Sequence, residues 1–207
     1  MGEGWKVMAR GYRGMTPEQR LADRRERLLH AAYAQFAEPG FSDTTIERLC
    51  AIARISNRAF YECFSGRHDL MRAVYERCVD EAAAAVVRAM HAAPNALDAR
   101  IEAGVREYVT FVMADRRRAR IMNLEVRRAD NSVHVFRRHK LSILAQMIEK
   151  SLPDFTGTAP DNVHQLVLGV LGAVHELLLD VMMSPKPEEL DEVIRTAVHI
   201  FRKSLEP

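Results

Sequence analysis

The sequence predicts an all-α fold of about nine helices, and three observations support that prediction. Apolar residues recur at helical spacing along most of the chain, and capping or helix-breaking residues separate the repeats. No stretch rich in valine, isoleucine and threonine alternates as a strand would. The 207 residues are 48% apolar, which is enough for a hydrophobic core of one large or two small domains.

The amino-terminal segment predicts a flexible arm followed by the first helix. Residues 1–15 contain four glycines among scattered basic residues, and we expect them to form the arm. Thr16 and Pro17 suit the N-cap and the first position of a helix, and Pro39-Gly40 is expected to end it.

Two short helices are expected next. Thr44 and Glu47 have the spacing of a capping box, in which the Thr44 hydroxyl accepts the Glu47 amide hydrogen, and this helix ends near Ala53. Ser56 is expected to cap a second helix that runs through Phe64. Their lengths and their short connection are those of a helix-turn-helix.

The rest of the chain predicts six further helices. They are expected at residues 67–90, 97–113, 116–125, 134–152, 163–183 and 190–201. The strongest apolar repeat is Val163, Leu166, Val167, Val170, Leu171, Val174, Leu177, Leu178 and Val181. Because that stretch also carries histidines and acidic residues, we do not expect it to span a membrane.

Charge and cysteine content exclude several classes of protein. Thirty basic against 28 acidic residues give a formal charge of +2, which excludes a histone-like polycation and an acidic disordered chain. The three cysteines, Cys50, Cys63 and Cys78, form no C-x-x-C pair and no disulfide framework. The first residues hold no apolar signal segment, so we expect a cytoplasmic protein.

Enzymatic and metal chemistry are not expected. None of the eight histidines lies three or four residues from another histidine or a cysteine on one helix, so a zinc site is not indicated. The sequence has no glycine-rich phosphate loop, nucleophile elbow or H-E-x-x-H motif. We therefore expect no catalytic residue, no metal and no cofactor.

The exposed start of the second short helix is the candidate DNA-reading surface. A small core is expected from Ile46, Leu49, Ala53, Ile55, Phe60 and Phe64. This core leaves Ser56, Asn57, Arg58, Ala59 and Tyr61 facing outward. A helix presented in this way suits a major groove, where Arg58 matches the acceptors of a guanine and Asn57 those of an adenine.

The order of residues in this segment resembles the amino-terminal domain of the TetR family of transcriptional repressors. The matching residues are Gly40-Phe41, Thr44-Thr45, Ala53 to Ser56, Phe60-Tyr61, Phe64, and Arg67 with Leu70. The resemblance covers about residues 20–75, and the helical remainder is compatible with that family's ligand-binding half. It implies a flexible arm (1–15), a DNA-binding domain (16–66) and a ligand-binding and dimerisation domain (67–207).

The resemblance also implies which residues touch DNA. Together with the exposed residues of the second short helix, the candidate DNA contacts are Thr45, Arg54, Ser56, Asn57, Arg58, Ala59, Tyr61 and Arg67. Thr45 and Arg67 are expected on phosphates, and Tyr61 on the backbone or a thymine methyl group. Arg54 replaces the turn glycine that is usual in the family, so a positive φ there costs about 1 kcal/mol.

The last two helices predict a homodimer. Their apolar residues exceed what one small domain needs, and packing against the same pair in a second copy gives a four-helix bundle. The expected interface residues are Val163, Leu166, Val167, Val170, Leu171, Val174, Leu178, Val193, Ala197 and Phe201. Two-fold symmetry would place two recognition helices in successive major grooves of double-stranded DNA with an inverted-repeat operator.

A small apolar or amphipathic effector is expected among the helices of residues 67–183. Its candidate contacts, each of which is alternatively a core residue, are Tyr75, Tyr108, Phe111, Met122, Phe136, Met147 and His175. The resemblance places the short helix at 116–125 near the DNA-binding domain and gives it a part in transmitting the ligand signal. The sequence thus predicts a ligand-responsive repressor, with a helical interaction or ligand-binding protein lacking sequence-specific DNA binding as the alternative.

One basic cluster has two alternative interpretations. Residues 116–140 carry nine basic and two acidic side chains, a net charge of +7. The favoured interpretation is a solvated face paired with acidic neighbours. The other is a site for an anionic ligand or long-range attraction to DNA.

Overall fold

The computed structural model describes residues 14–151, 163–183 and 189–205, all of whose regular elements are helical. In chain order these are α1 (Pro17–Gln35), η2 (Phe36–Gly40), α2 (Ile46–Ala53), α3 (Asn57–Cys63), α4 (Arg67–Ala92), α5 (Leu97–Met113), α6 (Arg116–Arg120), η3 (Ile121–Glu125), α7 (Val126–Arg128), α8 (Asn131–Ser151), α10 (Val163–Met183) and α11 (Glu189–Leu205). With η2 joined to α1 and α6–η3–α7 taken as one broken helix, the described residues form the nine predicted helices. The predicted arm lies almost entirely outside them.

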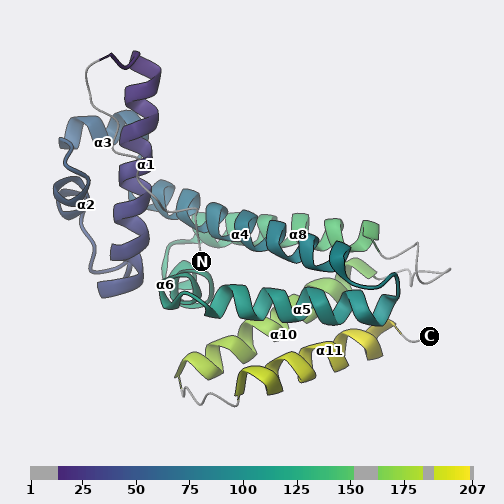
Figure 1. Ribbon diagram of the computed structural model, residues 1–207. Coiled ribbons are helices and arrows are strands. Elements are labelled where there is room, and N and C mark those ends of the chain that lie inside the picture. The colour runs from purple at the N-terminus through teal and green to yellow at the C-terminus, as the bar shows by residue number, and fades with distance from the viewer. Residues whose placement is uncertain (1–13, 152–162, 184–188, 206–207) are drawn as a thin grey trace.

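The helices form two groups that are joined by α4 (Figure 1). The amino-terminal group consists of α1, α2 and α3 and lies at one end of α4. The second group extends along the rest of α4, where α5 and α8 pack on that helix and α10 and α11 complete the bundle. The long α4 therefore connects the helix-turn-helix directly to the core of the second group.

Helix α1 begins where the sequence predicts, and η2, which continues it, ends at the predicted break. The Thr16 hydroxyl accepts the Gln19 N–H at 3.2 Å, and the Gln19 side chain accepts the Thr16 N–H at 2.9 Å. At the other end Gly40 has a φ of 125°, a conformation that side chains with a Cβ rarely adopt. The chain can therefore turn sharply towards α2.

The N-cap of α2 is Thr45, one residue later than predicted. Its hydroxyl accepts the Arg48 N–H at 3.2 Å. Thr44 is fully buried, and its hydroxyl instead donates to the Gly40 carbonyl at 2.7 Å. The predicted Thr44–Glu47 capping box is wrong, because the tertiary contact with the end of η2 uses the Thr44 hydroxyl.

The turn between α2 and α3 has the strained backbone that the sequence predicts. Arg54 is the C-cap of α2 and has a φ of 54°, the left-handed region that favours glycine. Its side chain is exposed. The cost of about 1 kcal/mol is therefore present in the folded chain and is offset by the core that the turn permits.

A small apolar core fixes α2 and α3 against α1. Leu49 and Phe60 are fully buried, Phe64 is 2% exposed, and all three belong to the same core cluster as Leu28 and Tyr33 of α1. The Phe60 and Phe64 ring centroids are 6.3 Å apart. This core determines which face of α3 remains exposed.

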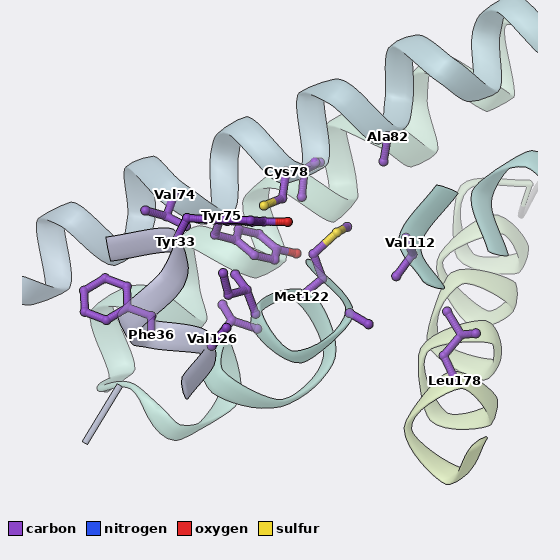
Figure 2. Packing of buried hydrophobic residues seen from close by; sticks show 14 of the residues in the cluster. Tyr33, Phe36, Val74, Tyr75, Cys78, Ala82, Val112, Met122, Val126 and Leu178 are labelled. Atoms are coloured by element: carbon purple, nitrogen blue, oxygen red, sulfur yellow. The ribbon is translucent and has the colours of Figure 1, made fainter. Parts of the chain in front are cut away.

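The core continues along α4 into the second group of helices. Figure 2 shows Tyr75 and Cys78 of α4 facing Met122 of η3. Farther along, Gly104 lets α5 approach α4 closely, because a Cβ at this position would lie 3.1 Å from Met90 Cγ. The two groups of helices thus share one continuous apolar core.

Most residues predicted to form the dimer interface lie inside the protomer instead. The buried members are Val167, Val170, Leu171, Val174, Leu178, Val193, Ala197 and Phe201, each 8% exposed or less. Leu166 is half-buried, and the side chain of Val163 lies outside the described residues. That prediction is wrong for the buried eight, because α10 and α11 need their apolar faces to cover α5 and α8 of the same chain.

One stretch of α10, His164–Met183, is long and apolar enough to cross a membrane by length and composition alone. Its mean hydropathy is 1.9, and 39% of it is buried inside the protomer. It packs against α8 and α11. These contacts are those of a helix that belongs to a protein core.

Candidate DNA-binding surface and effector pocket

The start of α3 presents polar side chains outward. The Ser56 hydroxyl caps the helix by accepting the Ala59 N–H at 3.2 Å. Asn57 and Arg58 in the first turn are exposed. The Arg58 side chain is 91% exposed and lies 3.6 Å from Glu62, a loose pairing that leaves its guanidinium available to another acceptor. This geometry agrees with the role predicted for Asn57 and Arg58.

Two neighbouring residues of α3 face in different directions. Ala59 is 8% exposed and packs inward, so its predicted DNA contact is wrong. Tyr61 is 60% exposed, and the edge of its ring packs against Phe60 with the centroids 5.4 Å apart. The Tyr61 hydroxyl therefore points outward while its ring packs on Phe60, which suits the predicted contact with the DNA backbone.

The other predicted DNA contacts lie around this helix. Thr45 and Arg54 are exposed at the two ends of α2. Arg67, at the start of α4, is half-buried, and one terminal nitrogen of its guanidinium donates to the carbonyls of Phe41, at 3.2 Å, and of Thr44. Arg67 thus holds the segment that leads into α2, a structural role beside the predicted phosphate contact.

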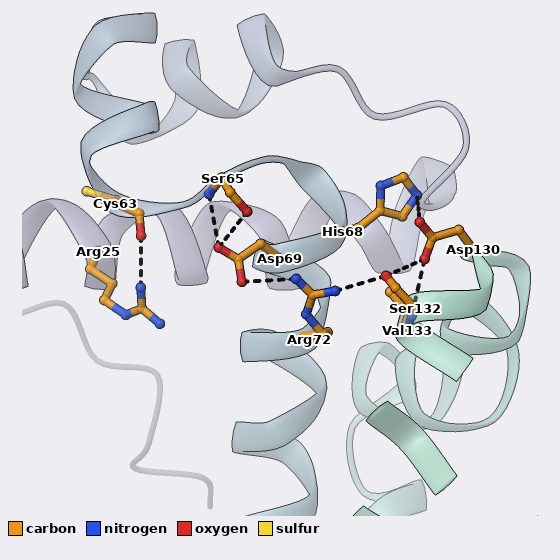
Figure 3. Close-up of polar contacts among 9 residues, drawn as sticks. All are labelled: Arg25, Cys63, Ser65, His68, Asp69, Arg72, Asp130, Ser132 and Val133. Atoms are coloured by element: carbon orange, nitrogen blue, oxygen red, sulfur yellow. Dashed lines mark hydrogen bonds and ion pairs between the residues drawn. The ribbon is translucent and has the colours of Figure 1, made fainter. Parts of the chain in front are cut away.

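A polar network connects the turn after α3 to the start of α8 (Figure 3). The Ser65 N–H and hydroxyl donate to Asp69, at 2.9 and 3.2 Å. Arg72 lies 3.4 Å from Asp69 and donates to the Ser132 hydroxyl at 2.9 Å. Ser132 in turn donates to Asp130 at 2.7 Å. A shift of α8 would therefore act on the turn that follows the recognition helix.

A second connection is the buried carboxylate of Glu125. It accepts the Phe41 N–H at 3.0 Å and pairs with Arg120 at 3.3 Å and Arg128 at 3.2 Å. Arg120 also donates from Nε to the Ala37 carbonyl at 2.7 Å. The helix at 116–125 thus adjoins the DNA-binding helices, as the resemblance implies, and its contacts are ionic and buried.

Acidic residues pair with much of the basic cluster at 116–140. The pairs are Arg117 with Asp115, Arg120 and Arg128 with Glu125, Arg127 with Glu176, and Lys140 with Glu76 and Asp80. These contacts agree with the favoured interpretation of the cluster as a paired surface. Arg137 differs, because it is only 9% exposed and no carboxylate of the described residues lies within ion-pair distance of it.

A partly open apolar cavity lies between α4, α5, α8, α10 and α11. Its lining residues are Ala83, Val86, Met90, Arg100, Ile101, Gly104, Val105, Tyr108, Leu144, Val170, Leu171, Val174 and Phe201. Tyr108 is the member that the sequence predicts. The sequence did not predict the lining residues of α4 and α5 other than Tyr108. Gly104 could have indicated them, because a glycine there lets these two helices approach closely.

The structure places four of the seven predicted effector contacts, Tyr75, Tyr108, Met122 and His175, in the buried core of the second group. The Tyr108 hydroxyl lies 2.8 Å from His175 Nε2, with Tyr75 in the same core. The fully buried Met122 also belongs to that core.

The remaining predicted effector contacts lie elsewhere. Phe111 is half-buried, and the Arg118 guanidinium lies 3.8 Å from its ring centroid. Phe136 is half-buried, and its ring centroid lies 5.9 Å from Lys140 Nζ. Met147 is 44% exposed. None of these three side chains lines the apolar cavity.

His175 predicts an acid-sensitive fold. Burial, with the charges of Arg137 and Arg127, lowers the pKa of His175 to about 3. The unfolded chain takes up a proton at this histidine near pH 6.5 and the folded chain does not, so stability falls as the pH drops below about 6.5. Between pH 7 and pH 5 this residue alone costs about 2 kcal/mol.

Denaturant unfolding at the two pH values measures this effect. The His175→Gln variant is expected to lose about 2 kcal/mol less than the unsubstituted chain over that interval. An equal loss in both proteins would contradict the assignment.

In residues 14–151, 163–183 and 189–205 no group of three or more histidine, cysteine or acidic side chains is arranged to hold a metal ion. The exposed polar face of α3 and the apolar cavity are therefore the two candidate sites.

The comparisons with known proteins agree with the two-group architecture. Residues 28–74 match the family model described as bacterial regulatory proteins, tetR family. No curated protein matches the sequence.

Three solved structures show the same fold at low sequence identity. A TetR-family regulator from Shewanella sp. PV-4 aligns with a TM-score of 0.72 at 13% identity, over 88% of this chain and 97% of its own. FadR from Bacillus subtilis, solved in complex with stearoyl-CoA, has a TM-score of 0.69 at 11% identity, over 87% and 98%. A TetR-family protein from Rhodococcus RHA1 has a TM-score of 0.61 at 22% identity, over 86% and 95%.

The family match covers α2, α3 and the parts of α1 and α4 that hold them, which is the segment that positions Asn57 and Arg58. The solved structures extend the agreement in fold over most of the chain. Residues 28–74 therefore form the amino-terminal domain that characterises the tetR family of bacterial regulatory proteins.

Proposed function

We propose that this regulator is a repressor that binds an inverted-repeat operator as a homodimer and is released by a small apolar or amphipathic effector. The observation that carries the proposal is the start of α3, where Asn57 and Arg58 are exposed on a helix that Phe60 and Phe64 hold in place. Thr45, Arg54, Ser56, Tyr61 and Arg67 complete the proposed contacts. The family is one of regulators and not of enzymes.

The proposed dimer uses the outer face of the last two helices. The outward residues of α10 include Gly169, Gly172, Ala173, Leu179 and Met183. Met183 is 72% exposed, and a Cβ at Gly169 or Gly172 would meet no atom within 4 Å. A second copy can therefore approach this face closely, and sedimentation at micromolar concentration is expected to show a dimer.

The proposed effector site is the apolar cavity together with the polar residues at its wall. The cavity lies between α4 and the other helices of the second group, so a ligand there bears on the helix that begins next to α3. The stearoyl-CoA in the Bacillus subtilis neighbour supports an apolar chain as one part of the effector. An effector that fits only the state with misplaced recognition helices weakens DNA binding by about 1–3 kcal/mol.

The proposed domain limits follow from the separate positions of the DNA-binding helices and the effector cavity. We assign residues 16–66 to DNA binding and 67–207 to effector binding and dimerisation, and we place the protein in the cytoplasm, where it reaches DNA. The networks around Asp69 and Glu125 connect the two parts.

The Arg58→Ala variant tests the assignment of the recognition helix. The operator is first selected from random DNA, and binding is then measured on the operator and on versions with single substitutions. The variant is expected to lose about 1–3 kcal/mol on the operator and its preference at one base-pair position.

Arg88→Ala is the matched control, since Arg88 is an exposed arginine near the far end of α4. It is expected to bind like the unsubstituted chain. If Arg58→Ala instead weakened binding to all sequences equally, Arg58 would be a phosphate contact. Absence of any sequence preference in the unsubstituted chain at low salt would refute the repressor and favour a helical ligand-binding protein.

A further inference from the structure

Five polar side chains from five different helical elements surround one point in the core of the second group. Arg137 comes from α8, Arg127 from α7, Tyr75 from α4, Tyr108 from α5 and His175 from α10. Tyr75 and His175 are fully buried, Tyr108 is 7% exposed and Arg137 is 9% exposed. A polar cluster this deep in an apolar core needs a physical explanation.

Electrostatic effects show that these groups are neighbours. Burial raises the pKa of Tyr75 to about 12, and the charges of Arg137 and Arg127 oppose part of that rise. The same two cations contribute to the low pKa of His175. Burial also raises the pKa of Tyr108, again opposed by Arg137. The cluster therefore combines guanidinium groups with neutral hydrogen-bonding groups at physiological pH.

Two polar atoms of the cluster have no hydrogen-bond partner within the described part of the chain. They are the Nε atoms of Arg137 and Arg127. The Tyr75 hydroxyl and His175 Nδ1 make no hydrogen bond of normal geometry either, although Arg137 lies next to the first and the Leu171 carbonyl next to the second. Buried polar groups left without partners cost free energy, and such groups gathered at one place are typical of a site that a ligand completes.

The cluster has an excess of positive charge. Arg127 pairs at its outer end with Glu176, whose side chain is 62% exposed, at 2.5 Å. No described carboxylate lies within ion-pair distance of Arg137. An uncompensated cation in a low-dielectric core favours binding of an anion, and a guanidinium fork matches the two oxygens of a carboxylate.

The polar cluster adjoins the apolar cavity through Tyr108. The Tyr108 ring lines the cavity, and the Tyr108 hydroxyl is 2.8 Å from His175 Nε2. Val174, which precedes His175 on α10, also lines the cavity. A molecule with its apolar part in the cavity would thus have its polar end at the Tyr108–His175 pair.

We propose that the effector of this protein is an amphipathic carboxylic acid, whose apolar part fills the cavity and whose carboxylate is bound by Arg137 with Tyr75, Tyr108 and His175. This inference rests on the proposed function, since it names the chemical class of the effector. A single carboxylate suits the site because Arg137 is the one guanidinium of the cluster that lacks a carboxylate partner among the described residues.

Decanoate and decanamide are the probes that test this proposal. They share the same alkyl chain, but only decanoate is charged. Titration calorimetry of the full chain is expected to give a dissociation constant for decanoate about tenfold lower than for decanamide. Equal dissociation constants, or no binding of decanoate at millimolar concentration, would overturn the proposal.

The variants Arg137→Met and Arg138→Met locate the effect. Methionine keeps the length of the side chain and removes the charge, and Arg138 is the exposed neighbour on the same helix. Arg137→Met is expected to bind both probes alike, while Arg138→Met keeps the preference for decanoate. A preference that survives in a folded Arg137→Met protein would refute the role of Arg137.

A further variant guards against loss of folding. Should Arg137→Met unfold, Arg137→Lys keeps the charge without the two-pronged donor. It is expected to retain a reduced preference for decanoate. An undiminished preference in Arg137→Lys would refute bidentate binding.

Operator DNA distinguishes failure of this inference from failure of the proposed function. If decanoate and decanamide release the operator equally well, the effector is apolar and the carboxylate site is refuted, while the repressor stands. If the chain neither binds a specific operator nor forms a dimer, the proposed function fails, whatever the probes do. Release by decyl phosphate in preference to decanoate would identify the anion as a phosphate and refute the carboxylate.

Discussion

The Glu125→Ala variant is expected to lose about 3 kcal/mol of stability and, with it, the connection between the DNA-binding helices and the second group. The Glu125 side chain is 1% exposed and bound at once to the Phe41 N–H, Arg120 and Arg128. Its removal leaves two guanidinium groups and one backbone donor without their acceptor. Because Arg120 and Arg128 retain some contact with water, the loss lies near the lower end of that for broken buried ion pairs.

Denaturant unfolding of Glu125→Ala and of the control Glu176→Ala measures this effect. Glu176 also pairs with an arginine, Arg127, but its side chain is 62% exposed. The control is therefore expected to change the unfolding free energy by less than about 1 kcal/mol. Similar losses of unfolding free energy in the two variants would show that the burial of Glu125 does not strengthen its contribution to stability.

The same variants distinguish stability from communication. In Glu125→Ala the amino-terminal helices are expected to unfold at lower denaturant concentration than the second group, seen as an earlier loss of DNA binding. A single transition shared by both groups would contradict a coupling that passes through Glu125.

The Phe60→Ala variant is expected to lose about 3–5 kcal/mol, the usual cost of deleting a buried aromatic side chain. Phe60 is fully buried between α3 and α1, where it contacts the rings of Tyr61 and Phe64. The loss of this ring removes the support of the recognition helix. DNA binding is therefore expected to disappear together with the fold of the amino-terminal group.

Thermal unfolding and DNA binding of Phe60→Ala are compared with those of Ile52→Ala. Ile52 lies on α2 with 47% of its surface exposed, so its truncation is expected to change stability by about 0.5 kcal/mol or less. A Phe60→Ala protein that keeps full stability would show that the core of the helix-turn-helix is not where the structure places it.

The sequence by itself determined the helices and which face of α3 is exposed. Thr16, Ser56 and the break at Gly40 act within a few residues, so their effect on helix limits follows from local hydrogen bonding and backbone freedom. The exposure of Arg58 beside the buried Phe60 follows from helical periodicity in the same way.

Only the tertiary structure decided which of two equivalent-looking residues is buried or paired. Thr45 caps α2 in place of Thr44, because the Thr44 hydroxyl donates a hydrogen bond to the Gly40 carbonyl of η2. The apolar faces of α10 and α11 were assigned to a partner, but they cover the protomer's own helices. Helical periodicity identifies an apolar face and does not say what covers it.

The arginines of residues 116–140 show most clearly that the sequence does not determine the partners of a side chain. In the sequence they form one basic cluster, whereas in the fold Arg120 and Arg128 pair with a buried carboxylate and Arg137 lies buried beside Tyr75 and His175. Local sequence fixes the charge of a side chain. The distance to its partner, and therefore its function, depends on residues that are far away in the chain and is decided by packing.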